Sequence, residues 1–134
     1  MSGEHDLDIL ISSMEPIRRD GRFVFVAVSS VRAMSLPSLA TVHEDEAITA
    51  VLRQEDADAR HLRYDVVCGW ITLQVHSAID AVGLTAAFST ALADAGIGSN
   101  VLAGYYHDHL LVPIDDVDRA LQVLHELADT RRET

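Results

Sequence analysis

Three histidines in the second half of the sequence are the residues whose type and spacing first suggest chemistry. His107 and His109 alternate along a segment expected to be extended, so their side chains would point to the same side. If His76 lies on the neighbouring strand, the three imidazoles could hold a metal ion and serve a metal-dependent enzyme. The His-Asp-His sequence also fits a turn in which Asp108 bonds its own backbone. Two histidines do not make a site, so we expect no metal there.

Other kinds of catalysis lack the residues that they require. All ten Lys+Arg residues are arginines, which removes Schiff-base, pyridoxal-phosphate and P-loop chemistry together, because each needs a lysine amine. Cys68 is the single cysteine, so an internal disulfide and a thiolate metal cluster are excluded. Ser77 has no nucleophile-elbow setting. We therefore expect no cofactor and no catalytic residues.

The charge of the chain restricts its partners. The formal net charge is -11, which repels the phosphates of a nucleic acid, whose binding depends on cations. No stretch approaches the ~20 consecutive apolar residues of a membrane-spanning helix. The first residues, MSGEHDLDIL, carry acids where a signal peptide carries positive charge. The sequence therefore predicts a cytoplasmic protein with neither nucleic acid nor membrane as a partner.

The first half of the sequence is predicted to mix short helices and strands. Apolar residues recur at helical spacing from Leu7 to Met14, and Pro16 is expected to close that helix. A turn is expected at Asp20-Gly21, before a strand. The region from 31 to 63 reads as two short strands and a short helix, or as one longer helix. The first interpretation, which we favour, gives a helix over 7–14, strands over 22–30, 39–43 and 47–53, and a helix over 55–61.

The second half has a clearer pattern. A helix over 84–95 carries apolar residues on one face, and Gly96 lies where the left-handed residue after a helix is expected. Asp115 is expected to cap a last amphipathic helix that ends near Arg131 and Arg132. The predicted elements of this half are a strand over 65–75, the helix over 84–95, strands over 100–106 and 109–113, and a helix from 115 onward.

This order of strand, helix, strand, strand, helix is typical of a ferredoxin-like α+β arrangement, except that the last strand is missing. The first half could donate that strand. We therefore predict two ferredoxin-like modules, with an antiparallel sheet and helices on one side. The N-terminal module is expected over 1–67 and the C-terminal module over 68–134, divided near Val66 to Gly69.

At this point the sequence resembles a known family. Gly83-Leu84, the helix with Phe88 and Leu92, Gly96-Ile97 and Asn100-Val101 resemble the ACT-domain signature of glycine, helix, glycine and strand. The stretch from Trp70 to Pro113 is similar to small bacterial proteins with two ACT-like modules in tandem, which are related in fold to the ACT modules of cytosolic arginine sensors. The N-terminal half lacks a comparable glycine pair, so its ACT-like module would be degenerate.

The resemblance implies a non-catalytic regulatory protein, not an enzyme, that binds an amino acid between ACT modules. The loop after the first strand, the helix N-terminus and the next strand would line the pocket. Amides at the start of the helix at Leu84 would favour a carboxylate, and Asp80 or Asp108 would hold the ammonium. Gly83 would serve close packing, ligand binding or both. The expected ligand-binding residues are His76, Asp80, Val82, Gly83, Leu84, Asn100, Val101 and Asp108.

Two further functions remain open from the sequence. A ligand-free assembly module would join copies or a partner through the ACT-like surfaces, and the family suggests a homo-oligomer. A metal-dependent enzyme would use His76, His107 and His109. The sensor interpretation is the one that we carry forward, with a small molecule, expected to be an amino acid, as the partner.

Overall fold

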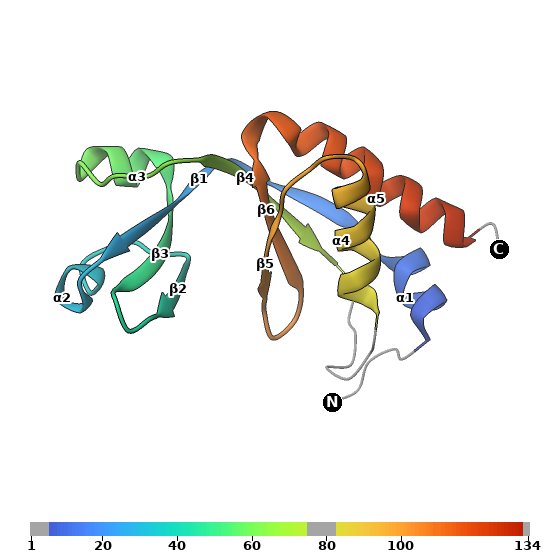
Figure 1. Ribbon diagram of the computed structural model, residues 1–134, viewed down its shortest axis with the longest axis horizontal. Coiled ribbons are helices and arrows are strands. Elements are labelled where there is room, and N and C mark those ends of the chain that lie inside the picture. The colour runs from blue at the N-terminus through green and yellow to red at the C-terminus, as the bar shows by residue number, and fades with distance from the viewer. Residues whose placement is uncertain (1–5, 75–82, 133–134) are drawn as a thin grey trace.

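The computed structural model describes residues 6–74 and 83–132, which form a curled six-stranded antiparallel sheet with helices on one face (Figure 1). The strand order is β2-β3-β1-β4-β6-β5. In chain order the elements are α1 (Leu7–Ser13), β1 (Pro16–Val28), α2 (Ser30–Ala33), β2 (Ala40–His43), β3 (Ile48–Arg53), α3 (Gln54–Ala59), β4 (Val67–Leu73), α4 (Leu84–Asp94), β5 (Asn100–Ala103), β6 (Asp108–Pro113), a 3-10 turn (Ile114–Asp116) and α5 (Val117–Arg132).

Strands β1 and β4 lie at the centre of the sheet and belong to both halves of the molecule. β1, β2, β3 and β4 with α2 and α3 form a complete ferredoxin-like unit with strand order β4-β1-β3-β2. β4, β6 and β5 begin a second unit, whose fourth strand is the first part of β1, where Pro16 pairs with Leu73 and Arg19 with Trp70. The first half of the chain thus donates the strand that the second half lacks, which the sequence allowed as one possibility.

A bulge in β1 allows the strand to serve both units. The register runs from Arg19 opposite Trp70 to Phe23 opposite Cys68, so β1 advances four residues while β4 advances two. Gly21 in the bulge has a φ of 115°, a left-handed value that glycine adopts without a Cβ clash. The prediction of a turn at Asp20-Gly21 was therefore wrong. These residues bend a continuous strand, because β4 pairs on both sides of the bulge.

The helices in the described part of the chain cover the same face of the sheet. Residues 67, 71 and 73 of β4 point to one side because side chains alternate along a strand. Val67 packs with the α2–α3 side, while Ile71 and Leu73 pack with α1, α4 and α5. Figure 1 shows the first group of helices at one end of the sheet and the second group at the other. The sequence prediction of helices on one side is confirmed.

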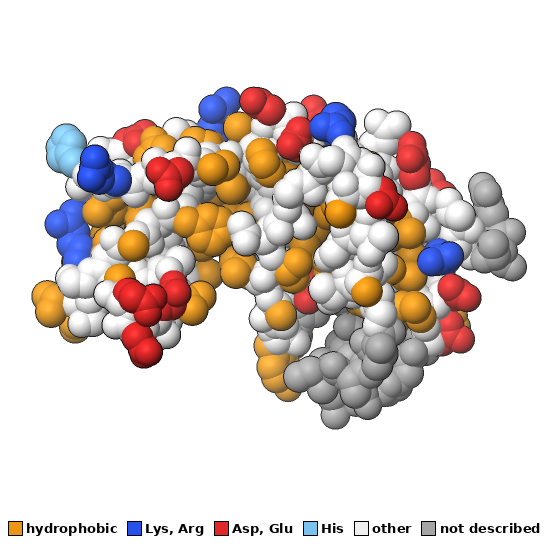
Figure 2. All heavy atoms as spheres, viewed as in Figure 1, with side chains coloured by type: hydrophobic (Ala, Val, Ile, Leu, Met, Phe, Trp, Pro, Cys, Tyr) orange, Lys and Arg blue, Asp and Glu red, His pale blue; other side chains and the backbone are white. Residues whose placement is uncertain are grey.

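The opposite face carries an apolar cluster of its own at the junction of the two halves. Phe23, Val51, Cys68, Trp70 and Leu111 are each no more than 5% exposed. The β2–β3 and β5–β6 hairpins extend to the same side of the curled sheet in Figure 1, and hydrophobic side chains gather between them in Figure 2. The curl of the sheet therefore helps to bury a face that no helix covers.

Helix α4 ends as the sequence predicts. Gly96 has a φ of 77°, the Gly96 N–H donates to Ala93 C=O at 2.9 Å, and the Ile97 N–H donates to Leu92 C=O at 2.9 Å. These two bonds form a Schellman motif. Ile97 and Leu92 are both buried in the core beneath α4, which fixes the direction of the chain toward β5.

The remaining predicted elements lie close to their expected places. β2, β3 and α3 confirm the interpretation of two strands and a short helix between residues 31 and 63. Strand β1 is longer than predicted, because it begins at Pro16, shortly after α1, and not at residue 22. Asp115 lies within the 3-10 turn before α5, and Arg131 and Arg132 lie in the last turn of α5. None of the helices in residues 6–74 and 83–132 is both long and apolar enough to span a membrane.

Replacing Gly69 with alanine should destabilise the protein. A Cβ at this position in β4 would lie 2.2 Å from Cγ2 of Val117, where α5 begins. The strand or the helix must shift, and such overpacking costs about 1–3 kcal/mol of unfolding free energy. Chemical denaturation measures the loss. Gly98→Ala is the matched control, because a Cβ there meets no atom of the described chain within 4 Å beyond its neighbours. Equal stability of both variants would show that α5 and β4 are not held this closely.

Candidate functional site

The residues expected to bind a ligand are only partly within the described chain. His76, Asp80 and Val82 lie outside the described residues. Gly83 is the N-cap residue before α4 and has a φ of 99°, and a Cβ there would lie 3.0 Å from Cδ2 of Leu7. Leu84 is 3% exposed and belongs to the core. In the described part of the chain, Gly83 thus allows close packing of α4 against α1, and the Leu84 side chain faces the protein interior.

The other three expected residues do not share one face of the sheet. Asn100 pairs with Leu111, whose side chain belongs to the face opposite the helices. Val101 packs against the core beneath the helices, and Asp108, opposite Leu73, points to that same side. The sheet therefore separates Asn100 from Val101 and Asp108. Because side chains alternate along β5 and β6, these three side chains do not line a single crevice.

His109 lies in a hydrogen-bonded cluster on the face opposite the helices. Its Nδ1 accepts a hydrogen bond from Trp70 Nε1 at 3.1 Å and lies 3.0 Å from Thr72 Oγ1. The Trp70 and His109 rings meet edge to face, with centroids 5.6 Å apart. Within residues 6–74 and 83–132, no three His, Cys, Asp or Glu side chains are grouped to hold a metal ion. Through its hydrogen bond with Trp70, His109 links β6 to β4.

Burial shifts the pKa values of two residues at this end of β6. It lowers the pKa of His109, with a further lowering from His107 and Arg19, against an opposing effect of Asp108. Burial raises the pKa of the Asp108 carboxyl, against opposing effects of His109 and His107. A neutral His109 matches its geometry, because an unprotonated Nδ1 is needed to accept the Trp70 N–H.

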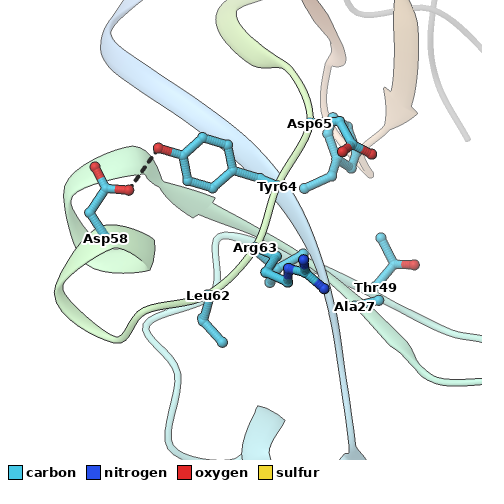
Figure 3. A pocket seen from close by; sticks show the side chains of 9 residues that line it. Ala27, Thr49, Asp58, Leu62, Arg63, Tyr64 and Asp65 are labelled. Atoms are coloured by element: carbon cyan, nitrogen blue, oxygen red, sulfur yellow. Dashed lines mark hydrogen bonds between the residues drawn. The ribbon is translucent and has the colours of Figure 1, made fainter.

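An open hollow lies elsewhere in the described chain, beside the end of β1. This Tyr64 hollow has a volume of about 940 Å³ and is open to solvent (Figure 3). Strand β1 pairs with β4 only as far as Val24 opposite Val67, so beyond Val24 the edge of β1 faces the hollow instead of a strand. The residues that line it are Phe25, Val26, Ala27, Thr49, Asp58, Leu62, Arg63, Tyr64 and Asp65.

The end of α3 positions the far wall of this hollow. The His61 N–H donates to Asp58 C=O at 3.1 Å and the Leu62 N–H donates to Ala57 C=O at 3.0 Å, while His61 has a φ of 56°. This Schellman motif turns the chain from the helix toward β4. Tyr64 then anchors the segment, since its hydroxyl donates to Asp58 Oδ1 at 2.7 Å and accepts from Gln54 Nε2 at 3.0 Å.

Both signs of charge border the Tyr64 hollow. Figure 3 shows Arg63 extending in the direction of Ala27 and Thr49, while Tyr64 turns toward Asp58. Arg63, Asp58 and Asp65 are all exposed. Arg63 and Asp65 have no hydrogen bond or ion pair with any described residue, so a guanidinium and a carboxylate are available there for a ligand. Arg63, Tyr64 and Asp65 are not among the site residues predicted from the sequence, although charged and aromatic residues in an irregular segment before a strand can indicate a functional loop.

A second cavity, the Asn100 pocket, lies where the two halves of the chain meet. Its volume is about 390 Å³. Its wall includes residues from the connection between α3 and β4, from the connection between α4 and β5, and from strands β1, β4 and β6. Burial raises the pKa of the Cys68 thiol in this wall, which keeps that thiol in its neutral form. The lining residues are Phe25, Asp65, Val66, Cys68, Gly98, Ser99, Asn100, Leu111 and Pro113.

Comparison with known families agrees with this architecture. Residues 2–69 match one family model of the ACT domain, and residues 65–126 match another. The chain therefore belongs to the ACT-domain family and carries two ACT domains in tandem. The matched ranges overlap in β4, the strand that both halves of the sheet share. Membership in this family supports a regulatory, ligand-binding role.

Solved structures extend the comparison. A Vibrio cholerae protein of unknown function, described as a possible transport protein, is 45% identical, with a TM-score of 0.84 over 91% of this chain and 95% of its own. An Agrobacterium tumefaciens protein is 19% identical, with a TM-score of 0.65 over 86% and 89%. The regulatory subunit of aspartate kinase from Thermus thermophilus is 7% identical, with a TM-score of 0.60 over 87% and 98%, and shares the fold. No functionally curated protein matches the sequence.

Acid should destabilise the protein through His109. Because burial lowers the pKa of His109 from 6.5, the unfolded chain binds this proton more tightly than the folded one. The free energy of unfolding should therefore be retained above about pH 6.5 and fall as the pH drops toward the lower folded value. The raised pKa of Asp108 has the opposite effect on the pH dependence of stability. The loss of unfolding free energy between about pH 7.5 and 5.5 is therefore compared, by denaturation, between the native protein and His109→Gln.

The variant should show a smaller loss of stability than the native protein over this interval. His125→Gln, which changes an exposed histidine on α5, is the matched control and should behave like the native protein. If the pH dependence of stability were unchanged in His109→Gln, a lowered pKa of His109 in the folded protein would be contradicted.

Removing the Tyr64 hydroxyl should loosen the wall of the hollow. Tyr64→Phe loses the bonds to Asp58 and Gln54, which together should contribute about 1 kcal/mol to unfolding free energy. Thermal and chemical denaturation measure this loss. Tyr105→Phe is the control, because Tyr105 is 82% exposed at the tip of the β5–β6 hairpin. Identical effects of the two substitutions would mean that the Tyr64 hydroxyl does not hold the segment.

Proposed function

We propose that this tandem ACT protein is a regulatory protein that binds a free amino acid, and that the amino acid's charged groups occupy the Tyr64 hollow. The observation that carries the proposal is the pair of unmatched charges at one open hollow, where Arg63 and Asp65 lack partners among the described residues. An α-carboxylate pairs with a guanidinium through charge-assisted hydrogen bonds, and an α-ammonium pairs with a carboxylate. These are the two groups that every free amino acid carries.

The edge of β1 adds to this complementarity. From Phe25 onward, β1 has β3 as a neighbour on one side only, and no backbone hydrogen bond joins 25–28 to the described segment 62–66. Backbone N–H and C=O groups along this edge can therefore bind the polar atoms of a small ligand. Thr49 and Asp58 supply further polar groups from the neighbouring elements.

The residues around Gly83 remain a second candidate location for the same ligand. In that arrangement the start of α4 binds the carboxylate and Asp108 binds the ammonium. Burial raises the pKa of the Asp108 carboxyl, and an ammonium placed beside it would act against that shift by favouring the ionised form. Variants of Arg63 and Asp108 distinguish the two locations.

Regulation requires that the ligand prefer one arrangement of the protein over another. The proposal includes the cytoplasmic location and the assembly into a homo-oligomer expected from the sequence and its family. Ligand binding at the hollow would stabilise the connection between α3 and β4, which links the two halves of the shared sheet. This connection is the element through which we expect binding to act.

A thermal-denaturation screen of the free amino acids tests the proposal. A ligand at about 100 times its dissociation constant adds about 2.7 kcal/mol to the free energy of unfolding, which raises the melting temperature by several degrees. In calorimetric titration, Arg63→Gln should lower the affinity for the amino acid that binds by about tenfold or more, because a hydrogen bond to a charged group is lost. Arg22→Gln is the matched control, since Arg22 is exposed and lines neither cavity.

The outcomes separate the candidate functions. A weakening in Asp108→Asn but not in Arg63→Gln would place the ligand near Gly83 instead. Equal weakening in Arg63→Gln and Arg22→Gln would mean that general charge, not the hollow, attracts the ligand. No stabilisation by any amino acid would overturn the sensor proposal and favour a ligand-free assembly module.

A further inference from the structure

The Tyr64 hollow and the Asn100 pocket share part of their walls. Phe25 and Asp65 line both cavities, so the two lie against each other along the connection between α3 and β4. Phe25 is partly buried in the cluster that joins the two halves of the sheet. A molecule held at Asp65 in the hollow therefore lies beside the opening of the pocket.

The two cavities differ in chemistry. Charged and polar side chains border the hollow, whereas the wall of the pocket is mostly apolar, with Val66, Leu111 and Pro113 among its residues. The neutral thiol of Cys68 adds to this apolar wall. Apart from Asp65 at the shared wall, none of the residues lining the pocket carries a formal charge.

We infer that the hollow and the pocket form one site, in which the hollow binds the ammonium and carboxylate of an amino acid and the pocket binds its side chain. This inference rests on the proposed function and adds the class of ligand, an amino acid with a large apolar side chain, such as leucine, methionine or phenylalanine. A cavity of about 390 Å³ lies within the size range of small-molecule sites.

The physical reason for this selectivity is desolvation. An apolar side chain gains free energy when it leaves water for the wall formed by Val66, Leu111 and Pro113. A charged side chain would lose its hydration there without a partner, because Asp65 already binds the α-ammonium. Small side chains such as that of alanine leave the pocket unfilled.

The pocket also explains how such a ligand would join the two halves of the molecule. Asp65 and Val66 precede β4, whereas Gly98, Ser99 and Asn100 lead from α4 into β5. A side chain between these connections contacts both halves at once. Asn100, one of the residues expected from the sequence to bind ligand, then contacts the side chain of the ligand rather than its ammonium or carboxylate.

Calorimetric titration of the full chain with leucine, methionine, phenylalanine, alanine, aspartate and lysine tests the inference. Each of the first three should bind at least tenfold more tightly than alanine, since even one methylene in an apolar pocket changes affinity roughly 10- to 200-fold. Aspartate and lysine should bind no better than alanine. These comparisons use the native protein and do not depend on the folding of a variant.

A substitution at the mouth of the pocket gives a second readout. Val66 is 53% exposed, so Val66→Trp can be accommodated while its ring reduces the space in the pocket. This variant should lose at least tenfold in affinity for leucine and little for alanine. Val42→Trp is the matched control, because Val42 is 49% exposed on β2 and lines neither cavity.

The failure of this inference is distinguishable from the failure of the proposed function. If no amino acid binds, the proposed function fails and the inference fails with it. If amino acids bind but apolar, small and charged ones do so equally, the inference alone is overturned. Unchanged leucine affinity in Val66→Trp, or equal loss in Val42→Trp, would also overturn the pocket assignment while leaving the hollow as the site.

Discussion

The antiparallel pairing of β1 with β4 is the interaction on which the rest of the structure depends. The first residues of β1 complete the strands of the C-terminal half, and its later residues pair with β3 in the N-terminal half. β4 likewise ends one unit and begins the next. Neither half has four strands without the other, and a half alone would expose a central strand edge. The shared strands therefore join the tandem domains in one continuous sheet.

The cavities follow from the same pairing. Because β1 is bent by its bulge and β4 begins only opposite Val24, the chain between α3 and β4 passes beside β1 without joining the sheet. The space that remains is the Tyr64 hollow, and the curl of the sheet brings the connection after α4 to the neighbouring Asn100 pocket. A regular, flat sheet of the same strands would have filled the first gap with ladder hydrogen bonds.

The ACT fold by itself does not define a ligand. A fold hosts many functions, and the chemistry of a site depends on the particular side chains placed there. In this protein, the helix start at Gly83 packs closely on α1, and the sheet separates Asn100 from Asp108. The unmatched charges of Arg63 and Asp65 at an open hollow give a more specific chemical argument than the position of the family signature.

The sequence determined most of the local structure, because periodicity and end signals act over a few residues. The apolar stripe of α4, the glycine at 96 and the strand patterns over 39–43 and 47–53 predicted their elements correctly. The missing strand of the C-terminal half was also evident from the order of elements. Only the tertiary structure decided that Asp20-Gly21 is a bulge, since a turn and a bulge share the same backbone preference at glycine. It also decided which face Asn100 points to and that Arg63 borders a hollow, because the register between distant strands leaves no trace in local spacing.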